Sequence, residues 1–370
     1  MTDTPSGCQK GTFSIQIFSI MKTTATLKKP IDLSFLKPKF LKEGGLKNSL
    51  FTIASILVFL GVWHLGATWL FNIEADRKIQ KALTEQGTEA ALKMEECIAS
   101  GAVKCKPNTL PTPNQVLAGF NTLWLDHKVI SADKKAFAQK TAKVNASREA
   151  KGLSPIAYTG RPSFVDQIGT SIKTVLAGVL LALLLAVPAG IVLGLSTRLK
   201  SSLNWIIQVF KPVSPVVWLL LVFMIVKTAI SNADMDKSFI ISFISVGLCS
   251  MWATLVNTSV GVSSVEKDYL NVASVLQLST FKKVFKVILP ASLPMIFTGL
   301  RITVSVAWMV LIAIELLAQS PGLGSFVWEE FQNGANDSNA KIIVAMFVIG
   351  FIGFALDRIM MYLQTAMSFK

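Results

Sequence analysis

Charged residues and histidines are scarce in this sequence, and each shortage excludes a class of protein. Only 16% of the 370 residues are charged, whereas soluble domains are about 25% charged. Hydrophobic residues make up 52% of the chain, and its mean hydropathy is +0.54. The two histidines and four cysteines form no cluster with the spacing of metal ligands, so no metal site is predicted. The composition predicts an integral membrane protein.

The motifs of catalysis are missing as well. No GxxxxGK[ST] loop occurs, so the chain has no P-loop to hold a nucleotide phosphate. Two histidines and scattered acids do not assemble into a Ser/His/Asp set or a carboxylate pair. The sequence therefore predicts no enzyme. A transporter built from this chain must take its energy from another protein or from an ion gradient.

The net charge of +14 is spread over the flanks of apolar segments rather than gathered in one patch. Lysines placed in this way favour contact with anionic membrane lipid over binding of nucleic acid.

Six apolar stretches predict an all-α membrane protein with six transmembrane helices. The first, residues 48–73, is free of charge for 26 residues. As a helix it extends about 39 Å, enough to cross a hydrocarbon core of about 30 Å. The other five predicted spans are residues 174–197, 212–226, 238–265, 291–320 and 342–367.

The spans divide the chain into a basic cytoplasmic tail (1–47), a first transmembrane helix (48–73), a partly helical insertion (74–166) and a five-helix core (167–370). We read no signal peptide in the tail, and Met21 is a plausible alternative start. The insertion is either a solvated connector or a docking surface for a soluble partner.

Lysines and arginines in the short loops predict the orientation in the membrane. The connections between spans two and three and between spans four and five are strongly basic. The loops on the opposite side mix lysines with acids. Both termini are therefore expected in the cytoplasm and the insertion outside it. There Cys97 and Cys105 could form a disulfide, with two free thiols as the alternative.

Residues 265–290 predict a helix–turn–helix at the cytoplasmic surface. Apolar residues from Val265 to Leu276 recur at helical spacing along one face. Ser279 is a candidate N-cap for a second short helix, which should end before Pro290 because proline disfavours helix at the preceding residue. We expect something outside the membrane to bind this unit.

Polar and ionisable residues within the spans are candidates for a translocation path, because each is costly in lipid. Glu315 lies late in the fifth span, where it should face the bundle or a water-filled path and pair across a subunit interface. For Arg301, Asp357 and Arg358, side chains that reach the headgroups are the favoured explanation. The path candidates are Glu315, Arg301, Trp308 and Asn257.

Residues 268–301 resemble the cytoplasmic loop of permease subunits of binding-protein-dependent ABC importers. The family pattern is Glu-Ala-Ala, three residues, Gly, nine residues, Ile, one residue, Leu-Pro. Here Asn271, Val272 and Ala273 stand at the Glu-Ala-Ala positions, Gln277 stands at the glycine, and Leu289 precedes Pro290. The glutamate and the glycine are thus lost. LPTP at 110, KPVSPVVW at 211, NTSVGV at 257 and LPMIFTGLRI at 293 are similar to the nitrate, sulfonate, taurine and bicarbonate branch, most of all to nitrate permeases.

The resemblance implies a type I ABC importer fold and a bacterial inner-membrane location. The helix–turn–helix would be the coupling helix, docked in a separate cytoplasmic ATPase that binds ATP and Mg²⁺, so this chain itself holds no cofactor. An extracytoplasmic substrate-binding protein would deliver the substrate, and two permease subunits would form a homodimer. The implied ATPase contacts are Tyr269, Asn271, Val272, Ala273, Gln277, Leu278, Ser279 and Thr280.

These observations predict a permease subunit that carries a small oxyanion inward, nitrate first. An alkanesulfonate, taurine or bicarbonate permease is the alternative within the branch. From another class, a proton-coupled secondary transporter would use Glu315 as its proton carrier, and a membrane scaffold would work through its insertion.

Overall fold

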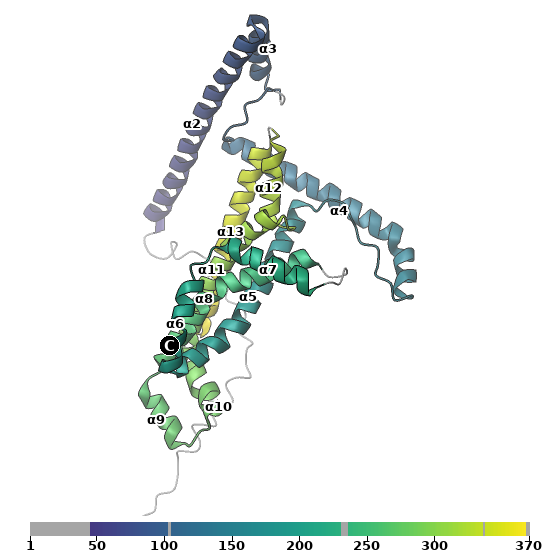
Figure 1. The fold of residues 1–370 in the computed structure, drawn as a ribbon. Coiled ribbons are helices and arrows are strands. Elements are labelled where there is room, and N and C mark those ends of the chain that lie inside the picture. Colours follow the sequence, from purple (N-terminus) through teal and green to yellow (C-terminus); the bar gives the residue numbers. More distant parts are fainter. Residues whose placement is uncertain (1–44, 103–104, 231–235, 336, 368–370) are drawn as a thin grey trace, which may run out of the picture. The chain divides into compact units, whose positions relative to one another are not determined.

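The computed structural model describes residues 45–102, 105–230, 236–335 and 337–367 (Figure 1). The predicted basic tail lies almost entirely outside them. By compactness the chain divides into Met1–Val62 and Trp63–Lys370, and each unit is described by itself. Every element formed by the described residues is helical, which confirms the predicted all-α class.

The described part of the first unit is the beginning of α2 (Gly45–Gln86), a helix of 42 residues. The helix does not end with the predicted apolar span at residue 73 but continues to Gln86. The reason is local. The polar stretch after Ile73 is rich in Ala, Lys, Gln and Glu, which are strong helix formers, and it contains no glycine or proline. Gly87, with φ 88°, ends the helix.

Two further helices form most of the predicted insertion, namely α3 (Thr88–Ala99) and α4 (Pro113–Glu149). Cys97, near the end of α3, is joined by a disulfide to Cys105 in the loop that follows this helix. The first half of α4 packs against α13 (Ser338–Met367), where Gly119 lies close to Ala340. This half of the insertion is therefore attached to the bundle rather than free in solvent.

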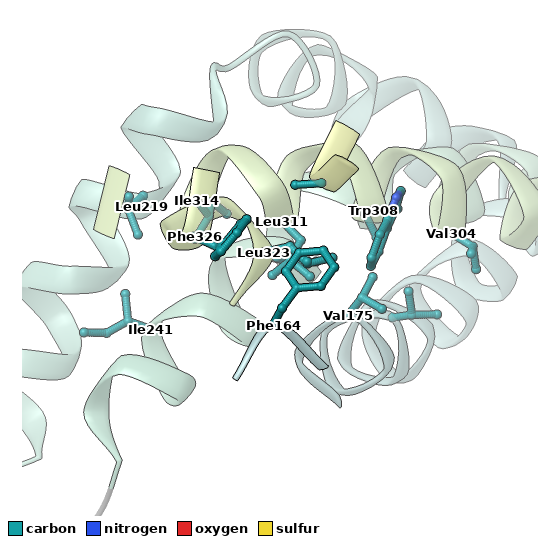
Figure 2. Packing of buried hydrophobic residues seen from close by; sticks show 14 of the residues in the cluster. Phe164, Val175, Leu219, Ile241, Val304, Trp308, Leu311, Ile314, Leu323 and Phe326 are labelled. Atoms are coloured by element: carbon teal, nitrogen blue, oxygen red, sulfur yellow. The ribbon is translucent and has the colours of Figure 1, made fainter. Parts of the chain in front are cut away.

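The core of the second unit is built from α5 (Phe164–Leu195), α8 (Lys237–Ser263) and α11 (Leu289–Ala318). The helix α8 packs closely against both of the others and is the most buried span. Figure 2 shows Leu311, Ile314 and Leu323 together in the apolar centre, with Phe164 and Phe326 beside them. Small side chains on α5 and α8 let the two helices approach closely, as is common in membrane bundles.

Five described helices are long and apolar enough to cross a membrane, and a sixth crossing needs α6 (Thr197–Phe210) together with α7 (Pro215–Ala229). These two meet at a bend of 98°. Alone, α7 has 15 residues and extends about 22 Å, which is less than the hydrocarbon core of about 30 Å. The predicted third span is thus either part of a broken crossing or part of a re-entrant loop. The helix α7 begins at Pro215, where Ser214 caps it.

The predicted end of the helix–turn–helix at Pro290 is wrong. Helix α10 (Thr280–Lys283) runs through a π-helical turn, η4 (Val284–Ile288), directly into α11. Pro290 therefore stands near the start of α11, inside one continuous run of helical turns. A proline ring normally clashes with the carbonyl four residues earlier. The wider π turn before it changes the hydrogen-bond register at this point, so the helix continues instead of breaking.

Candidate functional site

The hairpin formed by α9 (Lys267–Val275) and α10 is a folded unit with apolar residues on its surface. Val275 is 82% exposed, and the large side chains of Tyr269, Val272, Leu276 and Phe281 are exposed as well. Ala273 is the exception, because only 1% of it is exposed. Its side chain is therefore covered by its own chain, whereas its predicted contact with an ATPase stays a prediction.

A Schellman motif closes α9. The N–H of Gln277 donates to the carbonyl of Ser274 at 3.0 Å, and the N–H of Leu278 donates to the carbonyl of Ala273 at 3.1 Å. Gln277 has φ 49°, in the left-handed region. This position of the motif normally holds glycine, which carries no Cβ to strain. The glycine of the family pattern therefore has a physical reason, and the hairpin keeps the turn although glutamine replaces it.

The second unusual site surrounds Glu315, near the end of α11. Its side chain is 1% exposed. The hydroxyl of Ser171 on α5 donates to Oε1 at 2.7 Å and lies 2.9 Å from Oε2. The N–H of Gly324, in the first turn of α12 (Leu323–Asn333), donates to Oε2 at 2.9 Å. The partners of Glu315 thus come from its own chain, whereas the sequence suggested pairing across a subunit interface.

The turn before α12 is shaped around this carboxylate. The N–H of Leu323 donates to the Ser171 hydroxyl at 2.9 Å, so that hydroxyl accepts one hydrogen bond while it donates to Glu315. A Cβ at Gly322 would overlap the carboxyl group of Glu315, and one at Gly324 would overlap the carbonyl of Ile312. The N-terminus of α12 also favours a nearby negative charge. We call Ser171, Glu315 and residues 322–324 the carboxylate knot, because they join α5, α11 and α12.

The other predicted path residues have structural partners. Arg301 binds Asp357 through two contacts, Nε to Oδ1 at 2.7 Å and an Nη to Oδ2 at 3.0 Å, so the pair ties α11 to α13. Trp308 is buried, and its Nε1 donates to the carbonyl of Ile349 on α13 at 3.0 Å. Asn257 donates to the carbonyl of Ala253 in its own helix at 2.8 Å. These contacts do not place the four candidates on one common path.

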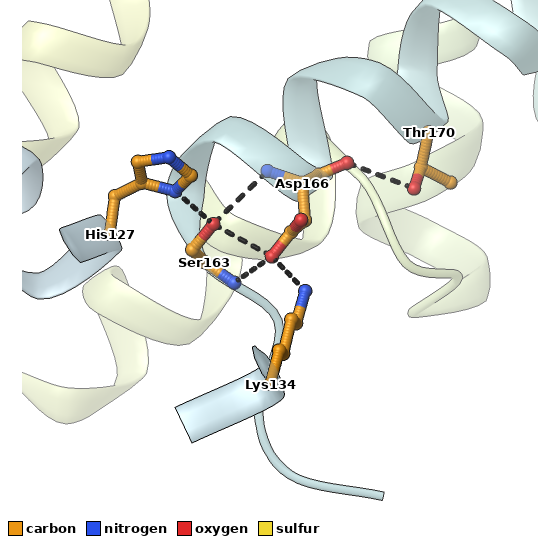
Figure 3. A network of polar contacts seen from close by, with 5 residues as sticks. All are labelled: His127, Lys134, Ser163, Asp166 and Thr170. Atoms are coloured by element: carbon orange, nitrogen blue, oxygen red, sulfur yellow. Dashed lines mark hydrogen bonds and ion pairs between the residues drawn. The ribbon is translucent and has the colours of Figure 1, made fainter. Parts of the chain in front are cut away.

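A polar cluster at the start of α5 brings together Ser163, His127 and Asp166 (Figure 3). Ser163 is buried and is the N-cap of α5, with Asp166 completing a capping box. The Ser163 hydroxyl donates to Asp166 Oδ2 at 2.7 Å, so Nδ1 of His127, at 2.8 Å, donates to that hydroxyl. Lys134 also binds Asp166. His127 and Lys134 belong to α4, and the cluster therefore holds α4 against α5.

This cluster does not have the geometry of a hydrolase. In a catalytic triad the histidine lies between serine and aspartate, whereas here both His127 and Asp166 contact the serine hydroxyl. Sequence reasoning missed the cluster. Its signal was the Ser-x-x-Asp spacing of residues 163–166 directly before an apolar run, which is typical of a capping box. For the same reason α5 begins at Phe164, ten residues before the predicted second span (174–197).

Comparison with known proteins places these helices in a transport family. Residues 176–369 match the binding-protein-dependent transport system inner membrane component family. The chain is 35% identical over 202 residues to the nitrate import permease protein NrtB of Synechococcus elongatus, covering 55% of this chain and 69% of that protein. It is 37% identical over 195 residues to the bicarbonate transport system permease protein CmpB of a Synechocystis species, covering 52% and 65%.

The chain therefore belongs to the family of inner-membrane components of binding-protein-dependent transport systems. Its similarity to nitrate and bicarbonate permeases confirms the branch that the sequence motifs indicated. It is a membrane protein with several spanning helices and a component of an ABC transporter.

Proposed function

We propose that this chain carries a small oxyanion, nitrate first, inward across the bacterial cytoplasmic membrane as the permease subunit of an ABC importer. The observation that carries the substrate class is the 35% identity to a nitrate import permease over most of that protein's length. A comparable identity to a bicarbonate permease supports bicarbonate as the second candidate. The chain has no P-loop, so the energy comes from a separate ATPase.

The α9–α10 hairpin is the proposed ATPase contact. Exposed apolar side chains on a folded polar loop are unusual unless a partner covers them, and the hairpin presents Tyr269, Val272, Val275 and Phe281 in this way. In this proposal the ATPase dimer closes on ATP and moves two permease subunits through their hairpins. Both chain termini then lie in the cytoplasm, and a substrate-binding protein delivers the anion on the other side.

The test is transport by proteoliposomes that contain this chain, its ATPase and its binding protein. We expect accumulation of isotope-labelled nitrate that requires ATP and persists when a protonophore is added. Accumulation of labelled bicarbonate, but not of nitrate, would keep the mechanism and change the substrate; taurine uptake would do the same. Uptake that needs no ATPase and stops with the protonophore would contradict the proposal and support the proton-coupled alternative.

A further inference from the structure

The first half of α4 lies at the level where the apolar parts of α2 and α13 end. Gly119 lies close to Ala340, just before the long apolar run of α13. Residues 118 and 119 also line one cavity with Phe71, which like them belongs to the second unit and stands just before the charged stretch of α2. A change from apolar to charged residues is typical of the level at which a helix leaves the hydrocarbon core. The start of α4 is therefore at one membrane surface.

Three large apolar side chains are exposed along one side of this half of α4. Leu117, Phe120 and Trp124 are 65%, 49% and 49% exposed. Their spacing of three and four residues puts them on one face of the helix, and we call them the apolar stripe. Buried residues such as Val116 and Leu123 mark a separate face, which packs against the bundle. The apolar stripe is thus left uncovered by the residues that the structure describes.

The charges of α4 differ between the side of the stripe and the opposite side. Lys128 and Lys135 continue the apolar stripe at helical spacing, and both are exposed. The Nζ of Lys128 lies 6.0 Å from the centroid of the Trp124 ring. Asp133 follows Trp124 by about two and a half helical turns and so lies on the opposite face. Lysines beside an exposed tryptophan, with an acid on the far side, are complementary to an anionic lipid surface.

We propose that the apolar stripe of α4 lies in the interfacial layer of the membrane, with Lys128 and Lys135 against the phosphates of anionic lipids. Tryptophan favours this layer because its ring is apolar and its N–H is polar. Basic side chains on the same face add electrostatic attraction to anionic headgroups. A soluble partner would also cover an apolar face, but it would not explain why the stripe lies at the level where α2 and α13 meet the membrane surface. Because Lys134 binds Asp166, α4 would also anchor the start of α5 at this surface.

Spin labelling of the full chain in nanodiscs measures the depth of the stripe. The background chain has Cys8→Ala and Cys249→Ala and keeps the disulfide of α3. A nitroxide is attached at Trp124→Cys and, as the matched control, at Asp133→Cys on the opposite face. Collision with a neutral, water-soluble nickel chelate should be at least threefold weaker at 124 than at 133, and collision with oxygen should be stronger. This pattern corresponds to a depth of about 5–10 Å in the interface.

A second labelled position keeps the test valid if the loss of the Trp124 ring itself loosens α4. Phe120→Cys should give the same protection from the nickel chelate as Trp124→Cys. Equal accessibility of the stripe positions and of position 133 would overturn the proposal. Protection of the stripe that appears only after the substrate-binding protein is added would also overturn it, because the stripe would then belong to a soluble partner.

Lipid composition tests the lysines. In phosphatidylglycerol nanodiscs, Lys135→Gln should raise the accessibility of the label at 124 to the nickel chelate at least twofold, whereas in phosphatidylcholine it should have no effect. Lys140→Gln is the matched control, since this exposed lysine lies on the other side of α4, and it should change nothing in either lipid. Equal effects of the two variants would overturn the assigned contact with anionic lipid. None of these measurements depends on transport, so the proposed function is tested separately.

Discussion

The hairpin and the carboxylate knot have similar helix ends, but their side chains lie in opposite surroundings. Each includes the end of a helix closed by a glutamine with positive φ, Gln277 at 49° after α9 and Gln319 at 50° after α11, and these are the non-glycine residues with positive φ in the described chain. The hairpin then turns its apolar side chains outward, whereas the knot turns its polar groups inward. The two helix ends are alike. The direction of the side chains is what distinguishes the hairpin, whose surface suits a partner, from the knot, which joins helices within the bundle.

The knot should be the more sensitive of the two regions, beginning with Gly322→Ala. The added Cβ would overlap the Glu315 carboxyl group, and overpacking of this kind costs about 3 kcal/mol. Thermal unfolding in detergent measures the loss. Gly169→Ala on α5 is the matched control, because a Cβ there meets nothing within 4 Å. Equal melting temperatures for the two variants would mean that the turn does not fit tightly around the carboxylate.

Glu315→Gln should lower the free energy of unfolding by about 2 kcal/mol, since the amide leaves a buried donor facing the donors Ser171 and Gly324. Transport should fall while assembly persists. Ser171→Ala, alone and combined with Glu315→Gln, completes a double-mutant cycle. The losses of unfolding free energy from the two single changes should not add in the double variant. Unchanged stability together with abolished transport would instead make Glu315 a path residue.

Val272→Asp tests whether the hairpin binds the ATPase, and here binding should change while stability does not. Val272 is exposed on α9, so the folded chain should keep its melting temperature. A charge on the proposed contact surface should weaken co-purification with the ATPase at least tenfold, which corresponds to about 1.4 kcal/mol. Leu92→Asp on α3, an equally exposed leucine outside the hairpin, should have no effect. If both variants retain the ATPase, the contact lies elsewhere.

Gln277→Gly should have the smallest effect of these changes, and it should stabilise the chain where the knot variants destabilise it. Glycine removes the strain of the left-handed residue in the Schellman turn, which is worth about 1 kcal/mol. The amides of α9 should exchange hydrogen about fivefold more slowly. Gln277→Ala keeps the strain and serves as the control. Faster exchange in the glycine variant would show that the freedom gained by the unfolded chain outweighs the relief of strain.

Much of the fold could be predicted from the sequence, because few kinds of segment can cross a lipid bilayer. Residues 48–73 and 238–265 lack charge for more than a membrane's thickness, and the structure has a helix over all of the first stretch and over the second as far as Ser263. The hairpin was also predictable, because the spacing from Val265 to Leu276 is helical and Ser279 stands at the N-cap of α10. Its far end was not, since a π turn before Pro290 has no simple signal in residue types.

The partners of Glu315 could not be read from the sequence. Ser171 is 144 residues away along the chain, and no periodic pattern links a serine in one span to a glutamate in another. Arg301 and Asp357 are a similar case, 56 residues apart. The sequence marked each of these residues as costly in a membrane, but only the packing of α5, α11, α12 and α13 shows what offsets the cost.

The most direct test of the central claim is a photo-crosslink from the hairpin to the ATPase. A photoreactive phenylalanine analogue at position 275, where the side chain is 82% exposed, should crosslink to the ATPase in the assembled transporter. The same analogue at position 92 on α3 should not. A crosslink at 92, or none at 275 in a complex that still co-purifies, would contradict the assignment of the α9–α10 hairpin as the site where ATP hydrolysis drives this permease.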